Sequence, residues 1–116
     1  YFIMAHTQLM KQSSIWLQKI YLLGFSMLKI LEDLIILARE RKKNPVEGSY
    51  TNKLLEDKTL AKEKVLEEID ELIDSVEKNT NKIHEAADVF YHLIIYLEKN
   101  GVMIEDIMHE LSKRKK

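Results

Sequence analysis

Residues that break helices are rare in this chain. Its 116 residues include three glycines and one proline. The breaks that divide the chain lie in residues 44 to 49, in residues 79 to 81 and at Asn100-Gly101, where glycine suits a helix end because it adopts the left-handed conformation. Between these breaks apolar residues recur every three or four positions, and no run of useful length alternates as a strand does. The sequence therefore predicts an all-α fold.

The pattern predicts a bundle of about four to five helices. We expect four of them over residues 27 to 43, 59 to 78, 81 to 99 and 104 to 115. We expect residues 27 to 116 to form one functional domain around a single core, as the chain length favours. We expect residues 1 to 26 to be an N-terminal extension of unknown role, either an extra helix or an unstructured segment.

The composition argues against several classes of protein. Eighteen basic residues (Lys+Arg 18) against Asp+Glu 19 leave a formal charge of -1, so no broad basic surface indicates nucleic-acid binding. The absence of cysteine excludes disulfides, thiolate metal sites and a cysteine nucleophile, and it suits a reducing cytoplasm. The most apolar stretches, residues 20 to 25 and 34 to 38, are far shorter than the roughly 20 residues that span a bilayer. We expect a cytoplasmic protein with no nucleic-acid or membrane partner.

The second expected helix places two acids beside an apolar stripe. The stripe, which we expect to face the core, consists of Val65, Ile69, Leu72 and Val76. Glu68 and Glu71 lie on its flank, one turn apart, whereas Glu67 points to solvent. Two carboxylates are thus expected at the margin of the core.

The third expected helix is apolar on two opposite faces. One face consists of Ile83, Ala86, Ala87, Phe90, Leu93, Ile94 and Leu97, and the other includes Val89, Ile95 and Tyr96. Glu85, Asp88 and His92 lie within the second face. Acids on a covered face need a partner or a metal. Two covered faces also favour a dimer, for which isologous packing is the commonest arrangement.

The two helices should form an antiparallel hairpin about residues 79 to 81. Glu71 then faces Glu85, and Glu68 faces Asp88. Four carboxylates in one place repel one another and raise some of their pKa values, whereas a hard divalent cation removes that penalty. Magnesium is the expected ion, and because it bridges to phosphate oxygens it indicates phosphoanhydride chemistry.

Other interpretations of the acids stay open. In a chain that is 32% charged, an acid-rich helix is commonly a solvated face. A di-iron bundle would require Glu-x-x-His repeats on two helices, and the sequence has none. His92 is either a hydrogen-bond donor to the acids or a satisfied interface histidine.

Several strings resemble a known family over about residues 27 to 114. They are Glu40-Arg41-Lys42, the string Gly48-Ser49-Tyr50-Thr51-Asn52-Lys53-Leu54-Leu55, then Lys64-Val65-Leu66-Glu67-Glu68 with Glu71, and Glu85-Ala86-Ala87-Asp88-Val89-Phe90-Tyr91-His92-Leu93. Together they resemble the phosphoribosyl-ATP pyrophosphohydrolases of histidine biosynthesis, within the MazG-like all-α nucleotide pyrophosphohydrolases. The chain departs from the family at Leu66, where glycine is usual, and at Glu63, where lysine is common.

The resemblance implies a magnesium-dependent enzyme that hydrolyses phosphoribosyl-ATP to phosphoribosyl-AMP and pyrophosphate, and that forms an intertwined homodimer. The expected metal ligands are Glu68, Glu71, Glu85 and Asp88, and the expected catalytic residues are Glu67, Glu68 and Glu71. The candidates for substrate contacts are Arg41, Ser49, Tyr50, Thr51, Lys53, Lys64 and Arg114. For Lys64, an ion pair with Glu68 is an equal alternative.

Two other functions remain as alternatives. A housekeeping nucleoside triphosphate pyrophosphohydrolase would use the same metal ligands with different base and ribose contacts. A non-catalytic helical interaction module would use the apolar faces alone. Residues 1 to 26 lack the cysteine and histidine ligands of the cyclohydrolase domain that is fused to some relatives, so we expect no cyclohydrolase activity.

Overall fold

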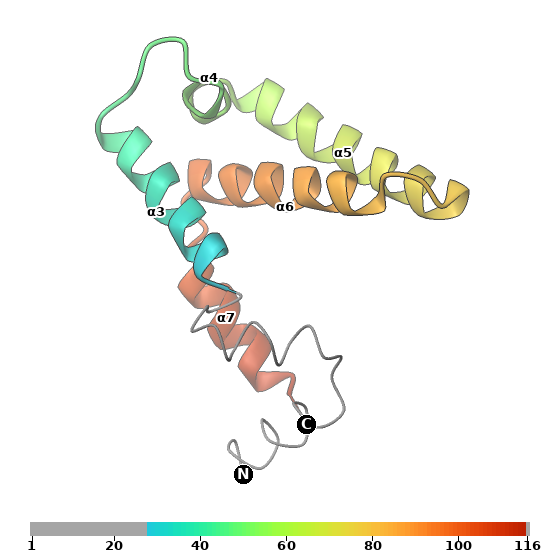
Figure 1. Cartoon of the computed structure of the whole chain (residues 1–116). Coiled ribbons are helices and arrows are strands. Elements are labelled where there is room, and N and C mark those ends of the chain that lie inside the picture. The colour runs from blue at the N-terminus through green and yellow to red at the C-terminus, as the bar shows by residue number, and fades with distance from the viewer. Residues whose placement is uncertain (1–27, 116) are drawn as a thin grey trace. The chain divides into compact units, whose positions relative to one another are not determined.

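A computed structural model describes residues 28 to 115, and all regular structure in that range is helical (Figure 1). The helices are α3 (Lys29–Lys43), α4 (Tyr50–Glu56), α5 (Lys58–Lys78), α6 (Lys82–Lys99) and α7 (Ile104–Lys113). The all-α prediction is confirmed, and four of the helices match the expected ranges to within two residues. Within this range no helix combines the length and apolar character that a membrane crossing requires. The expected extension, residues 1 to 26, lies outside the described residues.

Helix α4 was not predicted, because its residues lie between two of the expected helices. Ser49 caps this helix, because its side chain accepts a hydrogen bond from the backbone N–H of Asn52 at 3.3 Å. A seven-residue helix is marginal in isolation. Leu54 and Leu55 are buried, so tertiary packing stabilises it.

Helices α5 and α6 run antiparallel, side by side, as the predicted hairpin (Figure 1). Asn79 and Asn81 adopt positive φ angles of 56° and 50°, which asparagine tolerates better than most residues. The backbone N–H of Thr80 donates to the carbonyl oxygen of Ser75 at 3.0 Å and closes the turn. Asn81 precedes α6 as predicted, but its side chain makes no capping hydrogen bond.

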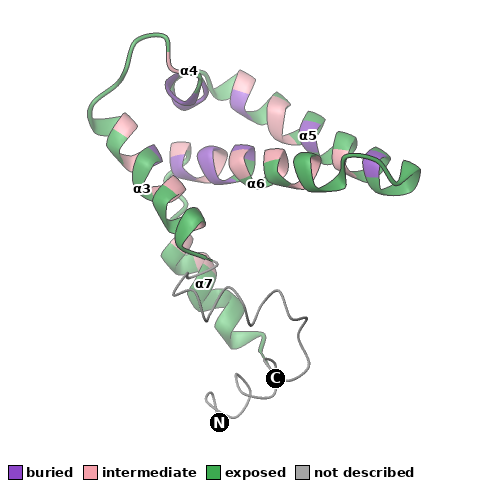
Figure 2. Cartoon of the chain, viewed as in Figure 1, coloured by how far each residue is buried: buried purple, intermediate pink, exposed green. Residues whose placement is uncertain are grey.

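The hydrophobic core lies at the end of the hairpin away from the turn. It consists of Ala38, Leu54, Leu55 and Ile95, with Leu60 and Tyr91 packed against it. Figure 2 shows these buried positions on α4 and on the C-terminal half of α6. The part of the hairpin nearer the turn therefore lies outside this core.

The apolar stripe of α5 faces the core only in part, because Val65 and Leu72 are half-buried whereas Ile69 and Val76 are exposed. The buried residues of α5 are Ala61, Glu68 and Ser75, whereas Val76 is 55% exposed. Small side chains at positions 61 and 75 allow a close approach between helices. Glu68, seven residues from each, is therefore directed into the hairpin rather than placed at its margin.

One arginine connects three helices at the core end. The Arg39 guanidinium donates to Glu98 at 2.9 Å and to Glu105 at 2.6 Å. Lys42 donates from Nζ to the carbonyl oxygen of Glu98 at 2.6 Å. We call Arg39, Glu98 and Glu105 the Arg39 clamp. It fixes α3 against the end of α6 and the start of α7.

Candidate functional site

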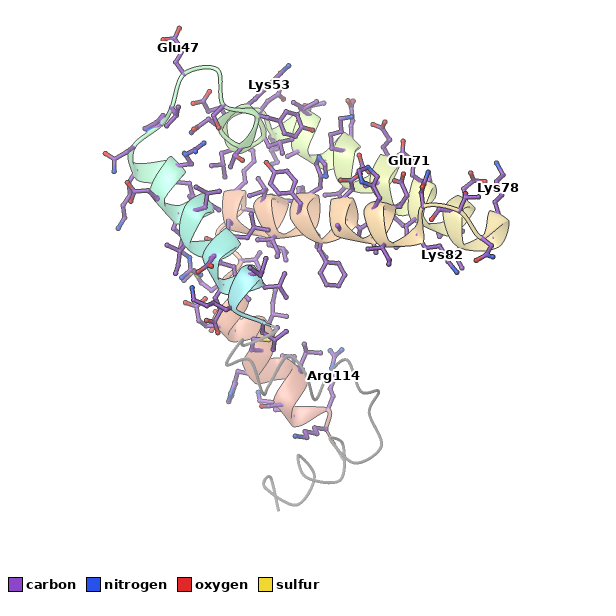
Figure 3. The ribbon with its side chains drawn as sticks, viewed as in Figure 1. Glu47, Lys53, Glu71, Lys78, Lys82 and Arg114 are labelled. Atoms are coloured by element: carbon purple, nitrogen blue, oxygen red, sulfur yellow. The ribbon has the colours of Figure 1, made fainter. Side chains whose placement is uncertain are left out.

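Three carboxylates converge between α5 and α6, as the hairpin prediction required. One oxygen each from Glu68, Glu71 and Glu85 lies within 4.8 Å of the others. Figure 3 marks Glu71 on α5, where α6 runs alongside. The periodicity of the two helices and the short turn bring these acids together. The convergence is confirmed for these three residues.

Asp88 joins the cluster through a second group. Ligand atoms of His84, Glu85 and Asp88 also lie within 4.8 Å of one another. His84 Nε2 lies 3.3 Å from a carboxylate oxygen of Asp88. The sequence analysis missed His84, although its position four residues before Asp88 puts the two on one helix face. We call Glu68, Glu71, Glu85 and Asp88 the carboxylate cluster.

Burial and crowding raise the pKa values of two members of the cluster, Glu68 and Glu85. Burial, followed by the charges of Glu71 and Asp88, raises the pKa of Glu68 to about 7, and Lys64 opposes this effect. Burial and then the charge of Glu71 also raise the pKa of Glu85. These are the shifts expected when acids crowd together without a neutralising cation.

Two oxygens of the cluster lie in the interior without a hydrogen bond. Among the described residues, neither Glu68 Oε2 nor Glu85 Oε2 has a partner. A buried acceptor without a partner is destabilising unless a ligand supplies one. The cluster offers carboxylate oxygens, which hard divalent cations prefer. The residues present therefore fit a magnesium ion.

Two of the residues expected to contact the substrate, Arg41 and Ser49, also contact each other. Arg41 Nη1 donates to Ser49 Oγ at 2.6 Å, and the side-chain amide of Asn52 donates to the carbonyl oxygen of Arg41 at 2.9 Å. These contacts fix the loop of residues 44 to 49 between α3 and α4. Arg41 and Ser49 are thus held in place by each other.

Two of the other basic candidates, Lys64 and Arg114, form ion pairs with acids near them in the sequence. Lys64 pairs with Glu67 at 3.2 Å rather than with Glu68, so that alternative for Lys64 was wrong. Arg114 lies at the end of α7, where it is within 3.7 Å of Glu110 (Figure 3). Lys64 is therefore near the carboxylate cluster, whereas the structure places Arg114 on another helix.

Two hydroxyls of α4 contact α6. The Tyr50 hydroxyl lies 3.0 Å from His92 Nε2, and Thr51 Oγ1 lies 2.6 Å from the Tyr91 hydroxyl. Thr51 and His92 are buried. The hydroxyl of Thr51, a candidate for substrate contact, is thus already engaged.

A cavity of about 600 Å³ lies along the loop and α4. Its lining consists of residues 45 to 49 with Tyr50, Asn52, Lys53 and Glu56. Figure 3 marks Glu47 and Lys53 on this part of the chain. Three of the expected substrate residues, Ser49, Tyr50 and Lys53, therefore share one cavity.

Comparisons with known proteins agree on one family. The phosphoribosyl-ATP pyrophosphohydrolase family profile matches residues 31–115. A phosphoribosyl-ATP pyrophosphatase of Clostridium novyi is 44% identical over 93 residues, covering 75% of this chain and 82% of that protein. Its counterpart in Clostridium acetobutylicum is 45% identical over 92 residues, covering 74% and 81%.

The chain is also similar to a longer protein. The histidine biosynthesis bifunctional protein HisIE of Pyrococcus furiosus is 39% identical over 96 residues. The match covers 80% of this chain but only 43% of that protein, so the chain spans less than half of this relative. No solved structure matches the chain.

Proposed function

The chain belongs to the phosphoribosyl-ATP pyrophosphohydrolase family, and from this premise we propose that it hydrolyses phosphoribosyl-ATP to phosphoribosyl-AMP and pyrophosphate in histidine biosynthesis. The observation that carries the proposal is the convergence of Glu68, Glu71 and Glu85 inside the hairpin. The oxygens that lack partners among the described residues, one on Glu68 and one on Glu85, support a role in binding a cation.

The carboxylate cluster would hold the magnesium ion. When bound, Mg²⁺ neutralises charge on the phosphate oxygens and makes a bound water more acidic. Water attacks the α-phosphorus, the bond from this phosphorus to the bridging oxygen breaks, pyrophosphate leaves with the bonding electrons, and the proton that the water loses passes to solvent. The acids Glu68 and Glu71 fix the reacting groups in place. Glu67, which pairs with Lys64 beside them, supports a water or a second ion.

The residues outside the cluster bind the rest of the nucleotide in this proposal. Lys53 and Tyr50 line the cavity, and Lys64 offers a positive charge beside Glu68, whose pKa it lowers. Arg41 and Ser49 shape the loop between them. The hydroxyl of Thr51, by contrast, is engaged by Tyr91, so Thr51 joins α4 to α6 and is not assigned a nucleotide contact. Arg114 is assigned to the phosphates of a neighbouring protomer's site.

Assembly as a homodimer, in the cytoplasm, is part of the same proposal. The hairpin exposes large apolar side chains on both helices, and Ile83 is 89% exposed. The others on these two helices include Leu66, Ile73, Val76, Phe90 and Leu93. An apolar surface of this kind favours an isologous partner. In sedimentation equilibrium, wild type should behave as a dimer and Phe90→Asp should shift toward monomer.

Pyrophosphate release from phosphoribosyl-ATP tests the function directly. Purified protein should release pyrophosphate with magnesium and should release none after chelation with EDTA. Faster release from deoxynucleoside triphosphates than from phosphoribosyl-ATP would favour the housekeeping alternative. A folded protein that releases no pyrophosphate from any nucleotide would support the interaction module and contradict our proposal.

A further inference from the structure

His92 is a buried polar residue of α6 that the proposed reaction does not use directly. It is 7% exposed and lies four residues after Asp88. Its Nδ1 lies 2.8 Å from the carbonyl oxygen of Asp88. A carbonyl oxygen only accepts, so Nδ1 carries the proton and donates it. In the neutral imidazole Nε2 is then the acceptor, and the Tyr50 hydroxyl, 3.0 Å away, donates to it.

Tyr50 lines the cavity and contacts α6 one helical turn from Asp88. It is the first residue of α4, and its side chain contributes to the wall of the cavity. Burial raises the pKa of its hydroxyl, and the nearby charges of Lys64 and Glu68 also act on it. Its ring meets the imidazole of His92 edge-on, with ring centroids 5.8 Å apart. Tyr50 therefore belongs to the cavity wall, contacts His92 and lies within range of the charge of Glu68.

We propose that His92 is a positioning residue, which holds Tyr50 between the cavity and the carboxylate cluster so that one nucleotide substrate engages both. The inference rests on the proposed function and adds a residue to it. The two hydrogen bonds of His92 connect Tyr50 of α4 to the backbone at Asp88 of α6. Without this connection, the cavity wall and the cluster would each form, but their relative position would vary.

Three substitutions separate the two hydrogen bonds. Tyr50→Phe removes only the hydroxyl, His92→Asn retains a donor near the Nδ1 position, and His92→Gln retains an acceptor near the Nε2 position. A neutral hydrogen bond contributes on the order of 1 kcal/mol, which corresponds to about fivefold in a binding constant. We expect Tyr50→Phe and His92→Asn to raise KM for phosphoribosyl-ATP about fivefold, with kcat changed less than about twofold. His92→Gln should restore part of the loss.

Two further measurements, the KM of a double variant and magnesium binding, distinguish a positioning role from a general loss of structure. The double variant Tyr50→Phe/His92→Asn should raise KM no more than either single change, because both remove one interaction. Magnesium binding to the protein without nucleotide, measured by calorimetry, should match wild type in Tyr50→Phe.

Tyr91→Phe is the matched control. It removes one hydroxyl from the same pair of helices, the one 2.6 Å from Thr51. It should lower the melting temperature and leave KM unchanged. The inference is overturned if Tyr50→Phe leaves KM unchanged, or if Tyr91→Phe raises it equally. If wild type releases no pyrophosphate from phosphoribosyl-ATP, the proposed function fails and this inference fails with it. A shift in KM with active wild type supports both.

Discussion

Two buried carboxylates in the same small bundle have opposite surroundings. Glu98 is 3% exposed, and both of its oxygens accept hydrogen bonds from the Arg39 guanidinium, at 2.9 and 3.2 Å. Glu68 is 7% exposed, crowded by other acids, and its Oε2 has no partner within the described part of the chain. The acid that pairs with Arg39 holds helices together, whereas we propose that the acid crowded by other carboxylates binds a cation.

The largest expected difference between these acids is in turnover. Glu68→Gln should lower pyrophosphate release on the order of 10³-fold, because it removes a negative ligand of the metal. Glu98→Gln should stay within about threefold of wild type at a temperature where it is folded. Asp88→Asn should resemble Glu68→Gln. Equal rates for Glu68→Gln and wild type would remove Glu68 from the proposed mechanism.

For the free energy of unfolding we expect the opposite: Glu98→Gln should be the damaging change and Glu68→Gln should not. Glu98→Gln should lower the free energy of unfolding by about 3 kcal/mol, because it removes the buried negative charge that pairs with Arg39 and leaves Arg39 only the exposed Glu105. In EDTA, Glu68→Gln should raise the same quantity by about 1 kcal/mol, because a neutral side chain relieves the repulsion. Urea unfolding followed by circular dichroism measures both. A loss of stability in Glu68→Gln without metal would contradict the contrast.

The pH dependence of stability should also have opposite signs in the two regions. Glu68 has a pKa of about 7 in the folded protein against an ordinary 4.5, so ionisation destabilises the metal-free fold as the pH rises from 4.5 through about 7. The hydrogen bonds from Arg39 lower the pKa of Glu105 to about 2. Its contribution is therefore present above 4.5 and lost as the pH falls through about 2.

Melting temperatures in EDTA test these signs. Between about pH 5 and pH 7, wild type should lose stability relative to Glu68→Gln. Below about pH 4 it should lose stability relative to Glu105→Gln, whose side chain cannot titrate. Parallel curves of melting temperature against pH for wild type and Glu68→Gln would show that the folded protein does not raise the pKa of Glu68.

Arg114 provides the smallest expected effect. Its ion pair with Glu110 is exposed and 3.7 Å long, so Arg114→Ala should change the free energy of unfolding by less than about 0.5 kcal/mol. If Arg114 contacts the phosphates of a nucleotide bound to the neighbouring protomer, Arg114→Ala should raise KM for phosphoribosyl-ATP without changing the free energy of unfolding. A large loss of stability would instead show that Arg114 stabilises the fold, as Arg39 does.

The periodicity of α5 and α6 predicted the convergence of the acids. The asparagine turn sets the register of the hairpin, and the helical repeat then brings Glu71 and Glu85 to the same level. The same pattern misjudged α5 in part, because Ala61 and Ser75 make weaker apolar signals than Val76 but allow closer packing. Helix α4 was missed because its stability comes from burial of Leu54 and Leu55 rather than from its own length.

Contacts between distant residues were not predictable from local pattern. Arg39 and Glu98 are 59 positions apart, and neither lies in a motif that indicates the other. The contact of Tyr50 with His92 likewise depends on α4 packing against α6. Sequence spacing identified the cluster because both of its helices share one short turn.

Magnesium titration of the nucleotide-free protein by calorimetry tests the central claim most directly. Three proteins are compared: wild type, Glu68→Gln and, at a temperature where it is folded, Glu98→Gln. We predict that wild type and Glu98→Gln bind magnesium with similar affinity, whereas Glu68→Gln shows no saturable binding. Equal binding by wild type and Glu68→Gln, or loss of binding only in Glu98→Gln, would contradict the assignment of the carboxylate cluster as the metal site.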